Sequence, residues 1–266
     1  MKLFISADIE GCAGLVLPAE THKQENIYRP FAEEMTKEVL AACEAAHEMG
    51  AEEIVVKDGH GDACNIDPFQ MPEYVTLIRG KSGHPYNMMW GIDESFDGVL
   101  FIGYHAPAGD PRFSVSHTST GNSLYLRLNG RYMSEFMLNT YTAASCGVPV
   151  LFLSGDEAIC SLAKELVPEI TTAASKWGEG GAAVCQPQPL VLERIRQGIK
   201  AALEKDFSAC RLSLPEKFVY EVTFKDWKRA YQMSFYPGMK SVDTFTNRLE
   251  TDSWMDVVTA HSFVVY

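Results

Sequence analysis

The sequence predicts an α/β fold with a largely parallel central sheet flanked by helices, followed by a smaller C-terminal α+β lobe. For the main domain, strand-like segments that are apolar along their whole length alternate with helical segments. Such strands are typical of parallel sheets covered on both faces. After Pro215 the segments become short, and apolar residues alternate with polar ones. We therefore expect an α/β domain over residues 1–214 and a lobe over residues 215–266, packed together as one compact unit.

In the first part of the chain, glycine or polar residues end each apolar run. The run before Asp8 leads into a glycine-rich turn, and Gly50 lies where a helix-terminating glycine is expected. The spacing predicts strands at 3–8, 52–58, 75–80 and 97–106, and one long helix at 26–49.

The second part of the chain continues the alternation of strands and helices. Asn129 and Gly130 form a dipeptide typical of a β-hairpin turn. We expect this hairpin within 123–133, strands at 148–156 and 170–177, and helices at 134–146, from Asp156 onward, and at 189–205. In the lobe we expect strands at 219–227 and 241–251, and a terminal helix capped by Asp252 or Ser253. The glycine-rich stretch 178–183 is predicted to be flexible.

Composition excludes several classes of protein. The 266 residues carry a net charge of −12, which argues against a nucleic-acid partner. No window reaches the ~18 apolar residues of a membrane span, and the apolar run at the start of the chain is too short for a signal peptide. The seven cysteines are odd in number and scattered, as in a protein with reduced thiols. We therefore expect a cytoplasmic protein with no membrane partner.

Three predicted strands end in acidic or imidazole side chains. Asp8 and Glu10 follow the first strand, Asp58 and His60 the second, and His105 the strand at 97–106. Ligands collect at the carboxyl ends of parallel strands, so these side chains are expected to converge. In D-x-E and D-G-H the spacing of two residues puts both side chains on the same side of an extended backbone.

This mixture of residues, without clustered cysteines, suits a hydrolytic Zn²⁺ or Mn²⁺ centre better than a structural zinc. Two metals that share a carboxylate lower the pKa of a bound water and polarise a carbonyl oxygen. Each motif alone has a simpler interpretation, because an acidic pair after a strand is commonly an exposed loop. Together the residues support a metal site and a structural role about equally.

Five blocks of the sequence carry a resemblance to a known family. They are KLFISADIEGCAG, VVKDGHGD, GYHAPAG, SVSHT and NGRYMSEFMLNTYTAASCGVPVLFLSGD. In this order they resemble the D-aminopeptidase family of bacterial zinc peptidases, peptidase family M55. The correspondence runs from Met1 to about Trp177, and more weakly through the lobe with its segment PGMKSVDTFT.

The resemblance implies a dinuclear zinc site in the 1–214 domain, with two zinc ions per subunit and Mn²⁺ or Co²⁺ as substitutes. The implied metal ligands are Asp8 (bridging), Glu10, His60, His105 and Glu135. From the residues alone, Glu135 is an acidic residue at a helix start, where the helix dipole already favours it. His117, in the SVSHT block, matches the histidine to which a catalytic role is assigned.

The activity that the resemblance implies is that of a metal-dependent aminopeptidase. A hydroxide bridging the two zinc ions would attack the N-terminal amide bond of short peptides, with a D-residue at the amino end. His117 would act as acid or base, or stabilise the transition state. A large ring-shaped homo-oligomer, a decamer, is also implied. Gly59, and the Thr-Ser-Thr that follows His117, depart from the family pattern and put the stereospecificity in question.

Two other functions remain open from the sequence. A dinuclear-metal phosphoesterase would use the same ligands, but few Lys or Arg residues lie near them in the sequence. A non-catalytic protein that binds peptides or metal would use the same pocket without hydrolysis. Among the remaining polar residues, we expect Asp58 to orient the loop of His60, Tyr104 to pack, and His261 to be a partly buried structural residue.

Overall fold

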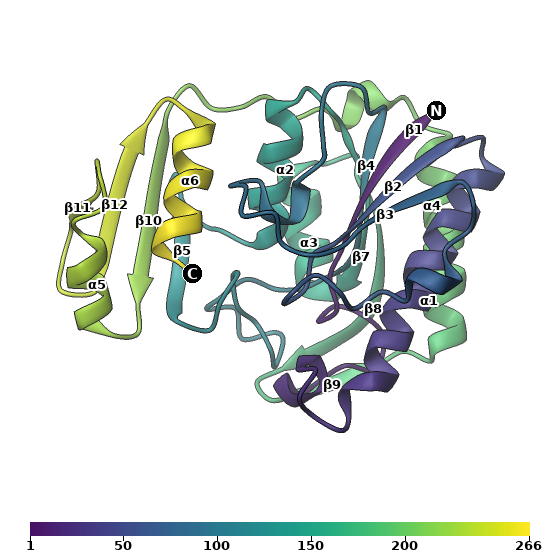
Figure 1. The fold of residues 1–266 in the computed structure, drawn as a ribbon, viewed down its shortest axis with the longest axis horizontal. Coiled ribbons are helices and arrows are strands. Elements are labelled where there is room, and N and C mark those ends of the chain that lie inside the picture. The colour runs from purple at the N-terminus through teal and green to yellow at the C-terminus, as the bar shows by residue number, and fades with distance from the viewer.

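A computed structural model describes all of residues 1–266 (Figure 1). Its main feature is a seven-stranded sheet with the order β3-β2-β1-β4-β7-β8-β9. All neighbouring strands are parallel except β9, which is antiparallel to β8. The strands are β1 (Lys2–Ala7), β2 (Glu53–Asp58), β3 (Val75–Ile78), β4 (Gly98–Tyr104), β7 (Val150–Asp156), β8 (Thr171–Glu179) and β9 (Ala182–Cys185). The strand order reverses direction between β1 and β4, the place where ligands bind in such sheets.

Helices cover both faces of this sheet, as Figure 1 shows. Helices α1 and α4 pack against each other on one face, and α2 and α3 lie on the other. Their bounds are α1 (Tyr28–Glu48), α2 (Glu135–Ser145), α3 (Glu157–Leu166) and α4 (Gln188–Leu203). Four short 3₁₀ helices lie in the connections, at η1 (Pro18–Thr21), η2 (Pro68–Gln70), η3 (Asn87–Met89) and η4 (Phe207–Cys210). No helix has both the length and the apolar character needed to cross a bilayer.

A second sheet of five strands, with the order β11-β12-β10-β5-β6, is antiparallel throughout. Its elements are β5 (Ser123–Leu128), β6 (Arg131–Tyr132), β10 (Phe218–Phe224), β11 (Lys240–Ser241), β12 (Thr246–Thr251), α5 (Trp227–Met233) and α6 (Trp254–Val264). Asn129 and Gly130 form the expected hairpin turn, both with positive φ. Ser253 caps α6, since its side chain accepts a hydrogen bond from the backbone N–H of Asp256.

The α/β fold class predicted from the sequence is confirmed. The division at residue 214 stays a prediction, but the second sheet also includes β5 and β6, which precede that residue. The stretch 178–183 was expected to be flexible, and it instead forms the β8–β9 hairpin. Gly180 has a φ of +58° and, with Gly181, makes the tight turn that lets the two strands pair.

The loop after β1 is held firmly against the sheet. The buried ammonium of Lys176, on β8, donates hydrogen bonds of 2.6, 2.7 and 2.7 Å to the carbonyl oxygens of Glu10, Cys12 and Leu15. The N–H of Gly11 donates to the carbonyl of Gly103 at 2.7 Å. This loop is therefore fixed by backbone contacts to β4 and by one buried cation.

Gly11 lies too close to β4 to carry a side chain. A Cβ atom on it would stand 1.9 Å from the carbonyl oxygen of Tyr104. We predict that Gly11→Ala lowers the free energy of unfolding by about 3 kcal/mol, because backbone atoms must move to admit the methyl group. Urea denaturation measures this, with Gly181→Ala as the control, since no atom lies within 4 Å of a Cβ there. Equal stability of the two variants would contradict the prediction.

Candidate metal centre

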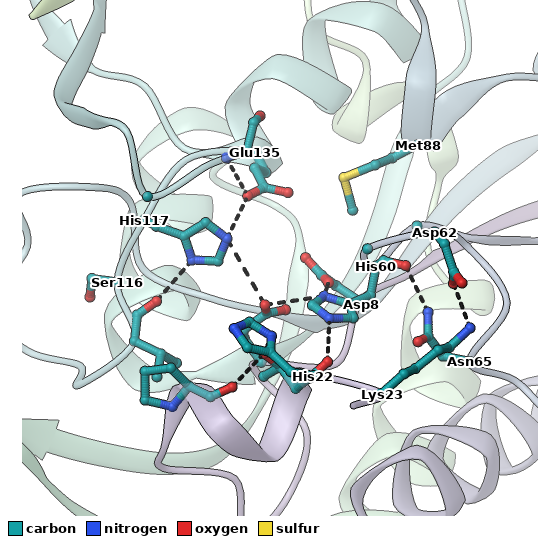
Figure 2. Close-up of a pocket in the computed structure, with 18 of the residues that line it drawn as sticks. Asp8, His22, Lys23, His60, Asp62, Asn65, Met88, Ser116, His117 and Glu135 are labelled. Carbon is teal, nitrogen blue, oxygen red and sulfur yellow. Dashed lines mark hydrogen bonds and ion pairs between the residues drawn. The ribbon is translucent and has the colours of Figure 1, made fainter. Parts of the chain in front are cut away.

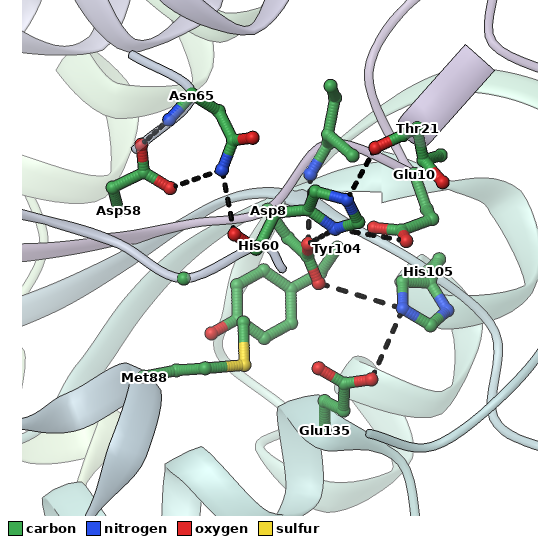
Figure 3. A network of polar contacts seen from close by, with 12 residues as sticks. Asp8, Glu10, Thr21, Asp58, His60, Asn65, Met88, Tyr104, His105 and Glu135 are labelled. Carbon is green, nitrogen blue, oxygen red and sulfur yellow. Dashed lines mark hydrogen bonds and ion pairs between the residues drawn. The ribbon is translucent and has the colours of Figure 1, made fainter. Parts of the chain in front are cut away.

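The carboxyl ends of three adjacent strands place the acidic and imidazole groups together. Asp8 and Glu10 follow β1, His60 follows β2 by two residues, and His105 follows β4 directly. Because β1 lies between β2 and β4, both histidines come from strands next to that of Asp8, and both reach its carboxylate (Figure 3). Four of the five side chains expected at the strand ends, Asp8, Glu10, His60 and His105, are thus brought to one point, whereas Asp58 is not part of this group.

Each oxygen of the Asp8 carboxylate faces a different histidine. Oδ1 lies 3.4 Å from Nδ1 of His60, and Oδ2 lies 3.6 Å from Nε2 of His105. On the first side Glu10 joins the group, with Oε1 3.1 Å from the same nitrogen of His60. Asp8 thus contacts both histidines, one through each of its carboxylate oxygens.

Glu135, the first residue of α2, completes the second side. Its Oε1 lies 3.4 Å from Nε2 of His105 and accepts a hydrogen bond of 2.7 Å from the backbone N–H of Ser119. Ser134 caps the helix, its hydroxyl accepting from the N–H of Met137. Glu135 is therefore buried and directed into the cluster, rather than exposed at the start of the helix.

His117 lies above this cluster, in the long loop between β4 and β5. Its Nε2 is 3.7 Å from Oε1 of Glu135 and 3.9 Å from Oε1 of Glu10. The ring stacks on that of His105, with centroids 4.4 Å apart. Its side chain is 26% exposed, against 1% for His105. His117 lines the pocket (Figure 2), whereas His105 does not.

Backbone carbonyls fix the orientation of all three imidazoles. Nε2 of His60 lies 3.0 Å from the carbonyl of Thr21, and Nδ1 of His105 lies 2.9 Å from that of Ala106. Nδ1 of His117 lies 2.9 Å from the carbonyl of Val115. A carbonyl only accepts, so each of these nitrogens carries the proton. In the neutral ring, the other nitrogen then presents a lone pair to the carboxylates, as a metal ligand requires.

Three groups of residues could each hold a metal ion, because within each group the donor atoms lie within 4.8 Å of one another. Asp8 belongs to two of the groups, one with Glu10 and His60 and the other with His105 and Glu135. The third group consists of Glu10, His105 and His117. The buried atoms Oε2 of Glu10 and Nε2 of His105 have no hydrogen-bond partner. Buried polar atoms without partners are costly, and a cation would satisfy them. A donor set of carboxylates and imidazoles fits Zn²⁺.

Asp58 is completely buried and holds the loop that follows His60. Its carboxylate accepts hydrogen bonds from the N–H of Asn65, from the side-chain amide of Asn65 and from the N–H of Ile66. The same amide group donates to the carbonyl of His60 at 2.7 Å. The carboxylate therefore supports the position of His60 through Asn65, in agreement with the role expected from the sequence.

His261, expected to be partly buried, is instead almost completely buried and belongs to a network behind the site. Its Nε2 lies 2.8 Å from the hydroxyl of Ser119, and its Nδ1 lies 2.9 Å from that of Tyr220. Burial lowers the pKa of His261 to about 4. Ser119 also donates its backbone N–H to Glu135, so this network joins α6 to the cluster.

A cavity of about 580 Å³ opens above the cluster. This volume suits a small ligand. Sequence reasoning missed three of its lining residues, Lys23, Lys81 and Tyr266, and it expected few cations near the ligands. Lys81 follows β3, at the same edge of the sheet as the predicted ligands. Its position after a parallel strand is the sequence feature that could have identified it as a pocket residue.

Comparisons with known proteins agree with this geometry. Residues 1–263 match a model of the family Peptidase_M55, described as D-aminopeptidase. This chain belongs to that family. A D-aminopeptidase of Bacillus subtilis (strain 168) is 31% identical over 239 residues, which cover 90% of this chain and 86% of the relative.

The solved structure of the Zn-dependent D-aminopeptidase DppA from Bacillus subtilis, a self-compartmentalizing protease, is similar throughout. The TM-score is 0.93 at 28% identity, over 100% of this chain and 97% of that one. The family and the enzyme class expected from the sequence, a metallo-aminopeptidase, are confirmed.

Strong coupling between buried charges defines the electrostatics of this family member. Burial and the neighbouring charge of Glu10 raise the pKa of Asp8 to about 7. Burial opposes ionisation of both His105 and Glu135, but the contact between these two groups outweighs burial. This contact raises the pKa of His105 to about 10 and lowers the pKa of Glu135 to about 2. Without metal, His60 and His105 thus hold protons that balance these carboxylates, since the neighbouring carboxylates raise the pKa of both histidines.

These shifts predict that zinc uptake displaces protons. At neutral pH the metal-free site holds a proton on His105, whose pKa is about 10, whereas a zinc ligand must be a neutral imidazole. Zinc affinity therefore rises between about pH 6 and pH 8, because fewer protons compete as the pH increases. Calorimetric titration in two buffers of different ionisation enthalpy counts the protons released. An apparent heat independent of the buffer would show that the prediction is wrong.

Proposed function

We propose that this protein is a dinuclear zinc aminopeptidase that removes an amino-terminal D-residue from short peptides. The observation that carries the proposal is the position of Asp8, whose two oxygens face His60 and His105 separately. One buried carboxylate between two imidazoles, each with a further carboxylate beside it, is an arrangement for two cations rather than one.

The proposed ligands divide into two sets that share Asp8. Glu10 and His60 would hold one zinc, and His105 and Glu135 the other. When bound, the two zinc ions supply Lewis acidity and lower the pKa of a water molecule at the site. The lining residues leave open space beside both sets for a substrate.

His117 is proposed as the catalytic acid and base. With its Nδ1–H donated to the carbonyl of Val115, its Nε2 faces Glu10 and Glu135 across the pocket. As a neutral imidazole, Nε2 accepts a proton during attack; once protonated, it donates that proton to the departing amine. Its greater exposure than His105 suits a group that touches substrate.

The relatives and the pocket together support the substrate class. The family description and both relatives named above specify D-aminopeptidase activity. The pocket volume of about 580 Å³ suits a short peptide rather than a folded protein. We therefore propose short peptides with a D-residue at the amino end as substrates.

We also propose that the protein assembles into a ring-shaped homo-oligomer, a decamer. The solved relative is described as a self-compartmentalizing protease. Aromatic side chains on α5, directly after it and on α6 are largely exposed in the single chain, and such side chains are typical of subunit interfaces. They are Trp227, Tyr231, Phe235 and Phe263.

A cytoplasmic location is proposed on the state of the cysteines. All seven are free thiols, and several are buried in the core. Proteins of oxidising compartments more commonly pair their cysteines.

Metal analysis followed by a substrate panel tests the proposed function. We expect two zinc ions per chain, hydrolysis of D-aminoacyl peptides in preference to the L-forms, and loss of activity on chelation that zinc restores. Aryl phosphates in the same panel test the phosphoesterase alternative. Fewer than one tightly bound metal per chain, or bound metal without hydrolysis of any peptide, would overturn the proposal.

We predict that His117→Ala retains zinc and loses most of its peptidase activity. No ligand is removed, but the proton transfer that His117 provides is worth about 10²–10⁴-fold in rate. Zinc content and kcat on a D-aminoacyl peptide are measured together. His47→Ala is the control, because this exposed histidine lies on α1 outside the pocket. Near-normal turnover in His117→Ala would remove its catalytic role.

A further inference from the structure

Two cations line the cavity, and they differ in their partners. Lys23 makes an ion pair of 2.5 Å with Asp62 and also donates to the carbonyl of Cys64. Lys81 makes no ion pair in the structure. Of the two lysines that line the pocket, Lys81 is therefore the one whose charge is not paired with a carboxylate.

Neutral groups hold the ammonium of Lys81 in place. It donates to the carbonyl of Gly59 at 2.9 Å and to Oδ1 of Asn87 at 2.8 Å. An ammonium has three N–H donors, so one remains for a ligand. Because Gly59 precedes His60, the first of these contacts places the charge beside the proposed zinc ligands.

The acceptor Asn87 is itself fixed. Its side-chain N–H donates to the hydroxyl of Tyr266 at 2.6 Å, which determines which end of the amide faces Lys81. Its backbone has a φ of +44°, a conformation uncommon for residues other than glycine. The carbonyl of Tyr266 accepts a hydrogen bond of 2.6 Å from Arg229. The wall formed by Lys81, Asn87 and Tyr266 is thus preorganised.

The pocket offers separate groups to the two ends of a short peptide. Asp8, Glu10 and Glu135 hold the proposed zinc ions, which neutralise their charge and mark the end where the amide bond is cleaved. A free carboxylate at the other end of the peptide needs a cation, and Lys81 is the pocket lysine that has no carboxylate partner. Two residues of extended chain span at most about 7 Å, so a dipeptide brings its two charges close together. Burial lowers the pKa of Lys81, and the nearby carboxylates of Glu135 and Asp8 oppose this shift.

We propose that Lys81 binds the terminal carboxylate of the peptide substrate, so that the enzyme prefers very short peptides with a free carboxyl end. This inference rests on the proposed aminopeptidase function and specifies its substrate. Lys81 is then a specificity-determining residue, while bond cleavage depends on the metal ligands and His117.

The test compares D-alanyl-glycine with D-alanyl-glycinamide, which differ only in the charge of the carboxyl end. For the zinc-loaded protein we expect kcat/KM to be about tenfold or more higher for the acid, mainly through KM, as for loss of a hydrogen bond to a charged group. Lys81→Met should bring this ratio close to one, while its zinc content stays that of the unaltered protein. Lys81→Arg, which keeps a cation, should retain the preference.

Lys23→Met is the matched control, since it removes a pocket lysine whose charge is already paired with Asp62. It should keep the preference for the acid. Equal kcat/KM values for the acid and the amide in the unaltered protein would overturn the role of Lys81, and so would a preference for the acid that is unchanged in Lys81→Met. Either result would leave the aminopeptidase function standing.

If neither compound is cleaved, the proposed function fails first, and calorimetric titration of the zinc-loaded protein with both compounds decides the inference. Tighter binding of the acid than of the amide, lost in Lys81→Met, supports the carboxylate site. Equal binding, or none, refutes it.

Discussion

Repulsion between buried carboxylates is the constraint around which this molecule is organised. Asp8, Glu10 and Glu135 are nearly inaccessible to solvent, and each lies within 4 Å of two of the three imidazoles of His60, His105 and His117. At such separations like charges in a low dielectric repel strongly, so the fold is stable only with positive charge among them. Protons on His60 and His105 supply it without metal, because the pKa of each is raised, and in the proposed enzyme zinc takes their place.

The rigidity around the site follows from that constraint. Carboxylates that repel one another would separate if their loops were free to move. The buried ammonium of Lys176 binds three carbonyls of the loop after β1, and Gly11 brings the same loop into backbone contact with β4. On the other side, Asp58 orders the loop of His60. A catalytic centre assembled from separate strand ends needs such support, because small displacements are costly in rate.

Structural features that depend on a single segment of the chain could be predicted from local sequence patterns. The apolar strands, the Asn129–Gly130 hairpin and the four side chains at the strand ends all follow from periodicity and from the topology of parallel sheets. Glu135 was different, because an acidic residue at a helix start looks the same whether it faces solvent or a metal site. Only the family resemblance singled it out.

Contacts between distant segments were beyond local reasoning. The pairing of β5 with β10 joins residues about ninety positions apart, and nothing in either strand specifies its partner. The role of Lys81 was missed for a similar reason, since its partner Gly59 lies in the loop after β2, twenty-two residues earlier.

The hydrogen bonds of Ser119 have a consequence for how this protein could evolve or be engineered. Its N–H supports Glu135, and its hydroxyl contacts His261 on the helix that packs over the second sheet. The two sheets therefore share one hydrogen-bonded element. The segment with α6 is not an exchangeable module, because a transplanted segment would have to reproduce the imidazole at position 261 to leave the position of Ser119, and with it that of Glu135, intact.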